Sequence, residues 1–205
     1  SLENAAILSV AGGLSFASHE HWDDDVREEV ALHPERFGRE VNNVLDAGGE
    51  SYNQLAASGA LYGLSLFLDH EPLHELSVDL LHALSIEIPL VIGLKHAFNS
   101  ERPDGASKGF PSGHVASSFT VSAVVHENYG WAAALPAYVF SGLVGFHRID
   151  TGNHDLSDVI FGAALGVVIG RTVGRNGSPS VEGLDLRPWT DPMSGARGIA
   201  VAGGF

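Results

Sequence analysis

The 205-residue sequence contains no cysteine, a single methionine, and only 11 lysines and arginines against 25 aspartates and glutamates. The lack of cysteine excludes disulfide scaffolds, thiolate metal sites and cysteine nucleophiles. The formal net charge of −14 disfavours nucleic acids and anionic lipid headgroups as partners. Lysine occurs only at Lys95 and Lys108, so a basic residue beside a polar motif is informative.

Apolar residues make up 44% of the sequence, and most recur at helical spacing. We expect an all-α fold, a compact single-domain helical bundle over residues 1–175, followed by a C-terminal extension over residues 176–205 of loop or short β-hairpin, with Gly198–Ala202 as one strand. The expected helices cover 26–45 with a break at Pro34, 51–68, 72–99 with a kink or interruption at Pro89, 112–126, 131–146 and 154–173. Within the first of these, one buried side is expected to hold Val26, Val30, Phe37, Val41, Val44 and Leu45.

A membrane-spanning helix needs about 20 apolar residues. The best candidate is Asn128–Phe146, which carries no charge but includes Pro136 and several glycines. The shorter apolar runs at 55–68 and 159–170 are typical of buried core helices, as is the run at 131–146. We therefore favour a soluble bundle over the alternative, a bundle embedded in a membrane. Residues 1–4 lack the basic start of a secretory signal and do not decide the compartment.

Basic residues and histidines concentrate in three short segments. The first runs from Lys95 to Pro103, at the end of an expected helix. The second is the Pro-Ser-Gly-His sequence at 111–114, which opens the next helix. The third runs from Arg148 to Asp158 and crosses a turn. This clustering in a chain poor in basic residues indicates a pocket for an anion with several charged oxygens.

The residue types fit phosphoryl transfer, in which charge spreads over three oxygens and fixed cations and N–H donors stabilise it. Arg102 and Arg148 can donate forked hydrogen bonds, and Lys95 supplies a compact charge. Ser112 and Gly113 begin a helix, where free N–H groups and the helix dipole attract anions.

Two histidines can divide the chemistry. His154 and Asp158 are four positions apart, so on a helix they share one face, and the carboxylate can orient one ring nitrogen and leave the other as a nucleophile. His114 has no carboxylate in its local sequence, so it can hold a proton for the leaving oxygen and then act as base for water. The product of the first step is a phosphohistidine, and no metal or other cofactor is required.

Lys95-x6-Arg102-Pro103, Pro111-Ser112-Gly113-His114 and Arg148-x5-His154-x3-Asp158 together resemble the three-part motif of the type 2 phosphatidic acid phosphatase superfamily. That superfamily also includes bacterial class A acid phosphatases and vanadium-dependent haloperoxidases. The motif spans 64 of the 205 residues. One departure is His147, at a position where serine is common.

The resemblance implies an all-α core, metal-independent dephosphorylation and an extracytoplasmic location, periplasmic or secreted. It also implies roles for the matching residues: His154 as nucleophile, Asp158 as its orienting partner and His114 as acid and base. The phosphate would be held by Lys95, Arg102, Ser112, Gly113 and Arg148.

We therefore expect a phosphatase that hydrolyses phosphomonoesters or pyrophosphate-type bonds in small molecules or lipids. The alternatives are a vanadate-dependent haloperoxidase, which would use the same pocket, and a non-catalytic phosphate-binding module. No nucleic-acid partner is expected, association with a membrane surface stays open, and the sequence does not determine the oligomeric state.

Other histidine clusters have plainer interpretations. His19-Glu20-His21 and the following Asp23-Asp24-Asp25 could bind a divalent metal, but a solvated acidic face is favoured because no further ligand is evident. His70, His74 and His82 are interpreted as partly buried or interfacial, and His147 as a candidate to line the pocket.

Overall fold

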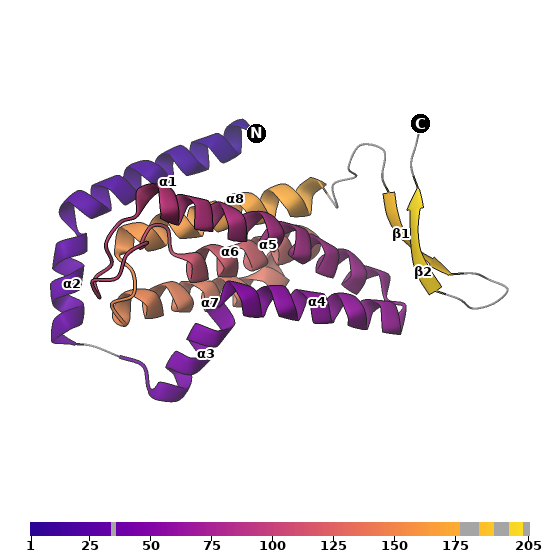
Figure 1. The fold of residues 1–205 in the computed structure, drawn as a ribbon, viewed down its shortest axis with the longest axis horizontal. Helices are drawn as coiled ribbons and strands as arrows, with labels where there is room; N and C mark the ends of the chain where they lie inside the picture. Colours follow the sequence, from indigo (N-terminus) through magenta and orange to yellow (C-terminus); the bar gives the residue numbers. More distant parts are fainter. Residues whose placement is uncertain (34–35, 177–184, 191–196, 203–205) are drawn as a thin grey trace.

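A computed structural model describes residues 1–33, 36–176, 185–190 and 197–202 (Figure 1). It confirms the all-α fold. In chain order the elements are α1 (Leu2–His21), α2 (Asp23–Leu32), α3 (Arg39–Gly49), α4 (Ser51–Leu68), α5 (Glu71–Phe98), α6 (Gly113–Tyr129), α7 (Trp131–Asp150), α8 (Leu156–Asn176), β1 (Asp185–Thr190) and β2 (Arg197–Ala202).

Local turn chemistry sets the ends of the central helices. Pro72 lies in the first turn of α5, where its missing N–H costs nothing. Asn99 ends α5 in the left-handed conformation, with φ of 45°. Gly130, at φ of 75°, separates α6 from α7. α5 runs through Pro89 as one helix, so of the two expected alternatives the interruption is wrong and the kink stays a prediction; a proline removes one main-chain donor, which a long packed helix tolerates.

The core forms where α6 packs against α5, α7 and α8. Its contact with α8 depends on glycines at every fourth position. A Cβ atom at Gly166 or Gly170 would collide with main-chain atoms of α6, and one at Gly162 with the carbonyl oxygen of Ser112, directly before α6. The two backbones therefore lie too close together to leave room for side chains at these positions, which small residues make possible. The buried apolar residues around this contact are Leu80, Ala83, Val91, Ala116, Val124, Leu165, Ile169 and Val173.

Several helices expose apolar faces that the sequence led us to expect in the core. On α7, Leu135, Val139 and Leu143 follow one another at a spacing of four and are 58%, 56% and 42% exposed. α4 likewise exposes Leu64, Leu66, Phe67 and Leu68. Val41 and Val44 of α3 are exposed too, and only Leu45 of that helix's apolar residues is buried. The expectation of buried core helices at 55–68 and 131–146 is wrong, because helical periodicity locates an apolar face without showing what covers it.

Within the described residues, α5 and residues 156–175 of α8 are long and apolar enough to cross a membrane. The expected candidate, Asn128–Phe146, is not one of them. The turn at Gly130 divides that stretch between α6 and α7.

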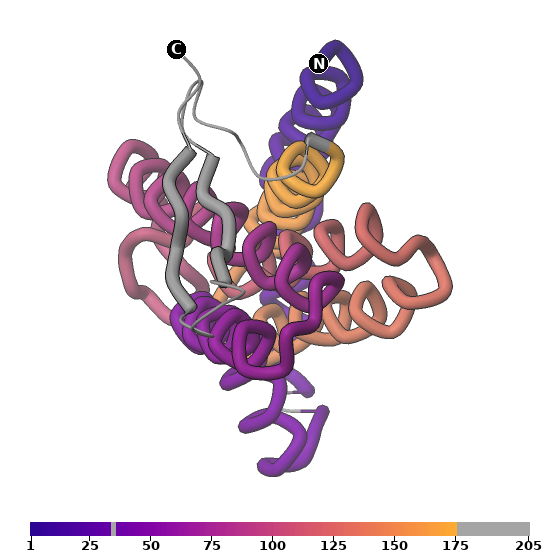
Figure 2. The backbone as a smooth tube through the Cα atoms, turned by 90° about the vertical axis from the view of Figure 1, so that its right-hand side faces the viewer, coloured from indigo at the N-terminus to yellow at the C-terminus, as the bar shows by residue number. Residues whose placement is uncertain are grey.

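The two helices expected on either side of Pro34 are present as α2 and α3. α1, over residues for which no helix was predicted, packs along α8, as Figure 2 shows. α2 then crosses the end of the bundle where α7 ends and α8 begins (Figure 1).

The C-terminal strands β1 and β2 pair antiparallel, from Asp185 opposite Ala202 to Thr190 opposite Arg197. The strand expected at Gly198–Ala202 lies in β2. The division into a helical domain over 1–175 and an extension over 176–205 stays a prediction.

Candidate active site

The three motif segments meet at one end of the bundle. Lys95 lies in the last turn of α5, His114 in the first turn of α6, Arg148 in the last turn of α7, and His154 just before α8. One cavity of about 220 Å³ is lined by these four residues together with Arg102, Gly113 and neighbours from α4 and α5. Ser112 and Asp158 lie behind this lining: the Ser112 main-chain N–H donates to the carbonyl oxygen of Asp158, at 3.2 Å.

The loop between α5 and α6 is folded back on the end of α5. The Lys95 ammonium donates to the carbonyl oxygens of Lys108 and Gly109, at 2.9 and 3.1 Å. Ser100 closes the loop, because its carbonyl oxygen accepts from the Gly109 N–H and its hydroxyl oxygen from the Phe110 N–H. These bonds place the cationic side chains beside the start of α6.

His154 is almost fully buried and is oriented by a carboxylate. Its Nδ1 lies 3.1 Å from Oδ2 of Asp158, and the same oxygen accepts from the Asp155 main-chain N–H at 3.2 Å. The pair does not share a helical face as expected, because His154 precedes the first residue of α8. Burial, and then the positive charges of Lys95, Arg148 and Arg102, lower the pKa of His154 well below 6.5. The imidazole is therefore neutral at neutral pH, with Nε2 as its second ring nitrogen.

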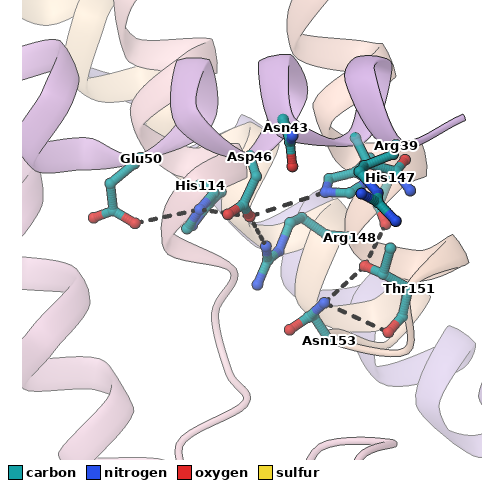
Figure 3. A pocket seen from close by; sticks show the side chains of 10 residues that line it. Arg39, Asn43, Asp46, Glu50, His114, His147, Arg148, Thr151 and Asn153 are labelled. Carbon is teal, nitrogen blue, oxygen red and sulfur yellow. Dashed lines mark hydrogen bonds and ion pairs between the residues drawn. The ribbon is translucent and has the colours of Figure 1, made fainter. Parts of the chain in front are cut away.

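His114 faces two carboxylates that its local sequence does not contain. Its Nε2 lies 3.4 Å from Oδ1 of Asp46 and 3.3 Å from Oε2 of Glu50. The same Asp46 oxygen accepts from Nη1 of Arg148 at 2.6 Å, so Asp46 lies between the histidine and the arginine (Figure 3). Burial, and then the charge of Arg148, lower the pKa of His114 to about 4, whereas Asp46 opposes the shift.

Some buried donors of the motif have no partner. Nε of Arg102 and Nε of Arg148 make no hydrogen bond within the part of the chain described. Ser112 occupies the position that precedes α6, but its hydroxyl makes no capping bond and is likewise unpartnered. Buried polar atoms are normally paired, so a cluster of such atoms is suited to an anionic ligand.

Sequence reasoning missed the acidic side of the site. Asp46 and Glu50 come from α3 and the start of α4, a region without a recognisable motif. With Arg39, Asn43 and Asn153 they line an adjacent polar pocket of about 580 Å³ (Figure 3). His147 lines it too, as anticipated. An (i, i+4) pair of acids is common on solvated helices, so no local signal marked these two.

The acidic stretch near the N-terminus is only partly a solvated face. Asp24 and Asp25 are exposed, but Asp23 is buried, which corrects the expectation for that residue. His19 lies 3.3 Å from Asp23. Among the described residues, no group of three or more histidines and acids is arranged to hold a metal ion.

Comparison with known proteins agrees with this geometry. Residues 76–176, which hold all three motif segments, match the model of the PAP2 superfamily. The part of the chain that carries the motif is thus similar to the PAP2 superfamily over just under half of the chain's length. The remaining residues, including all of α1 to α4, lie outside the matched range.

Two curated relatives cover parts of the chain. A lipid A 1-phosphatase of Porphyromonas gingivalis is 36% identical over 80 residues, which is 37% of this chain and 18% of the relative. A lipid A 4'-phosphatase of Helicobacter pylori is 31% identical over 109 residues, which is 47% of this chain and 53% of the relative. The chain thus spans about half or less of the length of these relatives.

Two solved structures have a similar fold. A transmembrane PAP2-type phosphatidylglycerolphosphate phosphatase from Bacillus subtilis aligns with a TM-score of 0.68 at 21% identity, over 83% of this chain and 93% of that one. LpxE of Aquifex aeolicus aligns with a TM-score of 0.56 at 25% identity, over 70% of this chain and 90% of that one.

Proposed function

We propose that the protein is a membrane-embedded phosphatase that hydrolyses lipid phosphates through a phosphohistidine intermediate, without a metal cofactor. The observation that carries the proposal is the shared cavity: two histidines from separate segments line it together with Lys95, Arg102 and Arg148. The lipid A phosphatase relatives support a lipid phosphate as substrate.

The exposed apolar faces support the membrane location. The stripe on α7 and the end of α4 would lie against lipid rather than water, while α5 and α8 cross the bilayer. The transmembrane neighbour of similar fold supports the same placement. The extracytoplasmic orientation of the site stays a prediction from the resemblance. His114 and His154 lie outside α5 and α8, at the end of the bundle.

In the first step, Nε2 of neutral His154 attacks phosphorus with its lone pair, and the bond from phosphorus to the ester oxygen breaks. Asp158 holds Nδ1 and stabilises the charge that the ring gains. The cationic side chains stabilise the negative charge on the three equatorial oxygens. The leaving oxygen takes a proton from His114, and the alcohol departs.

In the second step, His114 accepts a proton from water, the water oxygen attacks phosphorus, and the bond from phosphorus to nitrogen breaks to release phosphate. For the first step His114 must be protonated, although its pKa is about 4 in the free protein. A phosphate dianion bound on Arg148 raises this pKa, because it offsets the arginine charge and adds a negative charge beside the ring, although the burial of His114 remains. Substrate binding thus recruits the proton that the reaction uses.

The test is hydrolysis of an aryl phosphate and of phosphatidic acid by the detergent-purified protein in chelator. We expect turnover by the parent and a loss of at least about 1,000-fold in His154→Ala. A covalent phosphoenzyme should be trapped in alkali, where phosphohistidine survives, from the parent and not from His154→Ala. The matched control is His126→Ala, a histidine stacked on Trp131 at the other end of α6. Equal rates in parent and His154→Ala would refute the proposal.

A further inference from the structure

A forked ion pair joins helix α2 to the segment between α7 and α8, which carries His154. Nε and Nη2 of Arg27 donate to Oδ1 and Oδ2 of Asp155, both at 2.7 Å. Asp155 directly follows His154, and its side chain is only 5% exposed, whereas that of Arg27 is 38% exposed. A forked pair of this kind fixes direction as well as distance, because both planar groups must align.

A second contact from the same helix holds the start of α8. The Asp23 carboxylate accepts from the main-chain N–H of Ser157 at 3.1 Å and from its hydroxyl at 2.6 Å. Ser157 lies in the first turn of α8, where main-chain N–H groups have no partner within the helix. Asp23 thus caps α8 from a distant part of the chain. Ser15 of α1 adds a hydrogen bond from its hydroxyl to the Ser157 carbonyl oxygen, at 2.9 Å.

These contacts bear on His154 through one shared atom. Oδ2 of Asp158 accepts from the Asp155 N–H and also contacts Nδ1 of His154. A shift of Asp155 therefore moves the donor that locates Asp158, and with it the group that orients the nucleophile. α2 thus holds Asp155, just before the first residue of α8, and both α1 and α2 hold Ser157, just after it.

We propose that α2 is a positioning element for catalysis: the Arg27–Asp155 pair, supported by Asp23 on Ser157, fixes the orientation of the His154 imidazole. The inference rests on the proposed phosphohistidine function, and it assigns a role to a helix that lies outside the residues matched to the PAP2 superfamily. Arg27 and Asp23 touch neither substrate nor reacting atoms. They act through Asp155 and Ser157.

The molecule contains a comparable pair of contacts away from the site. Glu3 of α1 contacts Arg171 and Arg175 at the far end of α8, at 2.6 and 3.1 Å. It also joins the N-terminal helices to α8 by carboxylate–guanidinium pairs. Glu3→Gln is therefore the matched control for any effect of loosening the N-terminal helices as such.

The experiment compares Arg27→Met, Arg27→Lys, Asp23→Asn and Glu3→Gln by steady-state kinetics with an aryl phosphate. Because misplacement of a reacting group by about 1 Å can cost about 100-fold, we expect kcat to fall about 10- to 100-fold in Arg27→Met. The inhibition constant of inorganic phosphate should stay within about two-fold, because the cationic side chains that hold it are untouched. Arg27→Lys should recover part of kcat, and Glu3→Gln should keep the parent's kcat whatever its melting temperature.

The outcomes separate the inference from the proposed function. An Arg27→Met protein with a lower melting temperature but the parent's kcat would overturn the inference, as would equal losses of kcat in Arg27→Met and Glu3→Gln. If Arg27→Met does not fold, Arg27→Lys and Asp23→Asn carry the test, and full kcat in both would overturn the inference. Failure of His154→Ala to reduce turnover would instead reject the proposed function.

Discussion

Replacing Asp46 by asparagine should change both proton transfer and phosphate binding, because Asp46 touches His114 and Arg148 at once. The carboxylate lies 3.4 Å from Nε2 of His114 and its side chain is 58% exposed. At that distance a full charge contributes about 1.2 kcal/mol at the dielectric constant of water, which is the appropriate limit for an exposed group. Since 1.36 kcal/mol corresponds to one pKa unit, Asp46→Asn should move the basic limb of kcat about one pH unit lower.

The same substitution removes a competitor of phosphate. Asp46 accepts from Arg148 at 2.6 Å; Arg148 is buried, but Asp46 is 58% exposed, so we take the value of about 0.2–1 kcal/mol for a solvent-screened ion pair. The inhibition constant of inorganic phosphate should therefore fall about 1.5- to 5-fold. Both quantities come from pH–rate profiles and inhibition curves with an aryl phosphate. Asp25→Asn, an exposed acid on α2, controls for the change in net charge. An unchanged basic limb together with weaker phosphate binding would refute this account of Asp46.

Three further outcomes are expected. The basic limb of the pH profile of kcat should lie at higher pH than that of kcat/KM, because bound phosphate raises the low pKa of His114. The acidic limb should lie below pH 6.5, because the pKa of His154 is lowered. Coincident basic limbs in the two profiles would contradict this account of His114. Gly166→Ala should lower the free energy of unfolding by about 1–3 kcal/mol, because the added Cβ meets the α6 backbone. The control Gly63→Ala, where no described atom lies within reach of the added Cβ, should not lower it. Calorimetric unfolding of the two variants and the parent measures the difference. Glu87→Met should raise the melting temperature, because removing a buried carboxyl group that has no hydrogen-bond partner among the described residues gains about 1–3 kcal/mol, and a fall would show that Glu87 has a partner.

Much of the site was accessible from sequence because its residues lie in short segments. Lys95, Arg102, His114, Arg148 and His154 each stand beside a helix end or a loop, and their types restrict the chemistry they can perform. Once the helices were placed, only the packing of α5 to α8 was needed to bring these residues around one cavity. Their individual roles stay proposals until the variants are measured.

The acidic partners could not be predicted in the same way. Asp46 lies 102 residues from Arg148 in sequence, and Arg27 lies 128 residues from Asp155. Such pairs depend on how α2 and α3 dock on the bundle, and the apolar periodicity of these helices predicts an inner face without showing which residues that face meets. Asp23, in a run of three aspartates, is the buried member, and only the tertiary structure distinguishes it from its neighbours.

The error about buried helices has a different cause. An apolar face at 131–146 satisfies the pattern of a core helix and of a lipid-facing helix equally well. The spacing of apolar residues shows that one face of the helix is hydrophobic, but it does not show whether that face meets other helices or lipid.

The glycines at every fourth position of α8, Gly162, Gly166 and Gly170, restrict which part of the proposed active site can adapt to substrates of different size. His114 is carried by the first turn of α6 and His154 by the segment leading into α8, and these two helices interlock backbone to backbone. The distance between the two imidazoles is therefore fixed by the close packing of α6 against α8. Adaptation of the proposed active site to a bulky or a slender leaving group falls to the opposite wall, which α3 forms where it packs on α7, α6 and α4.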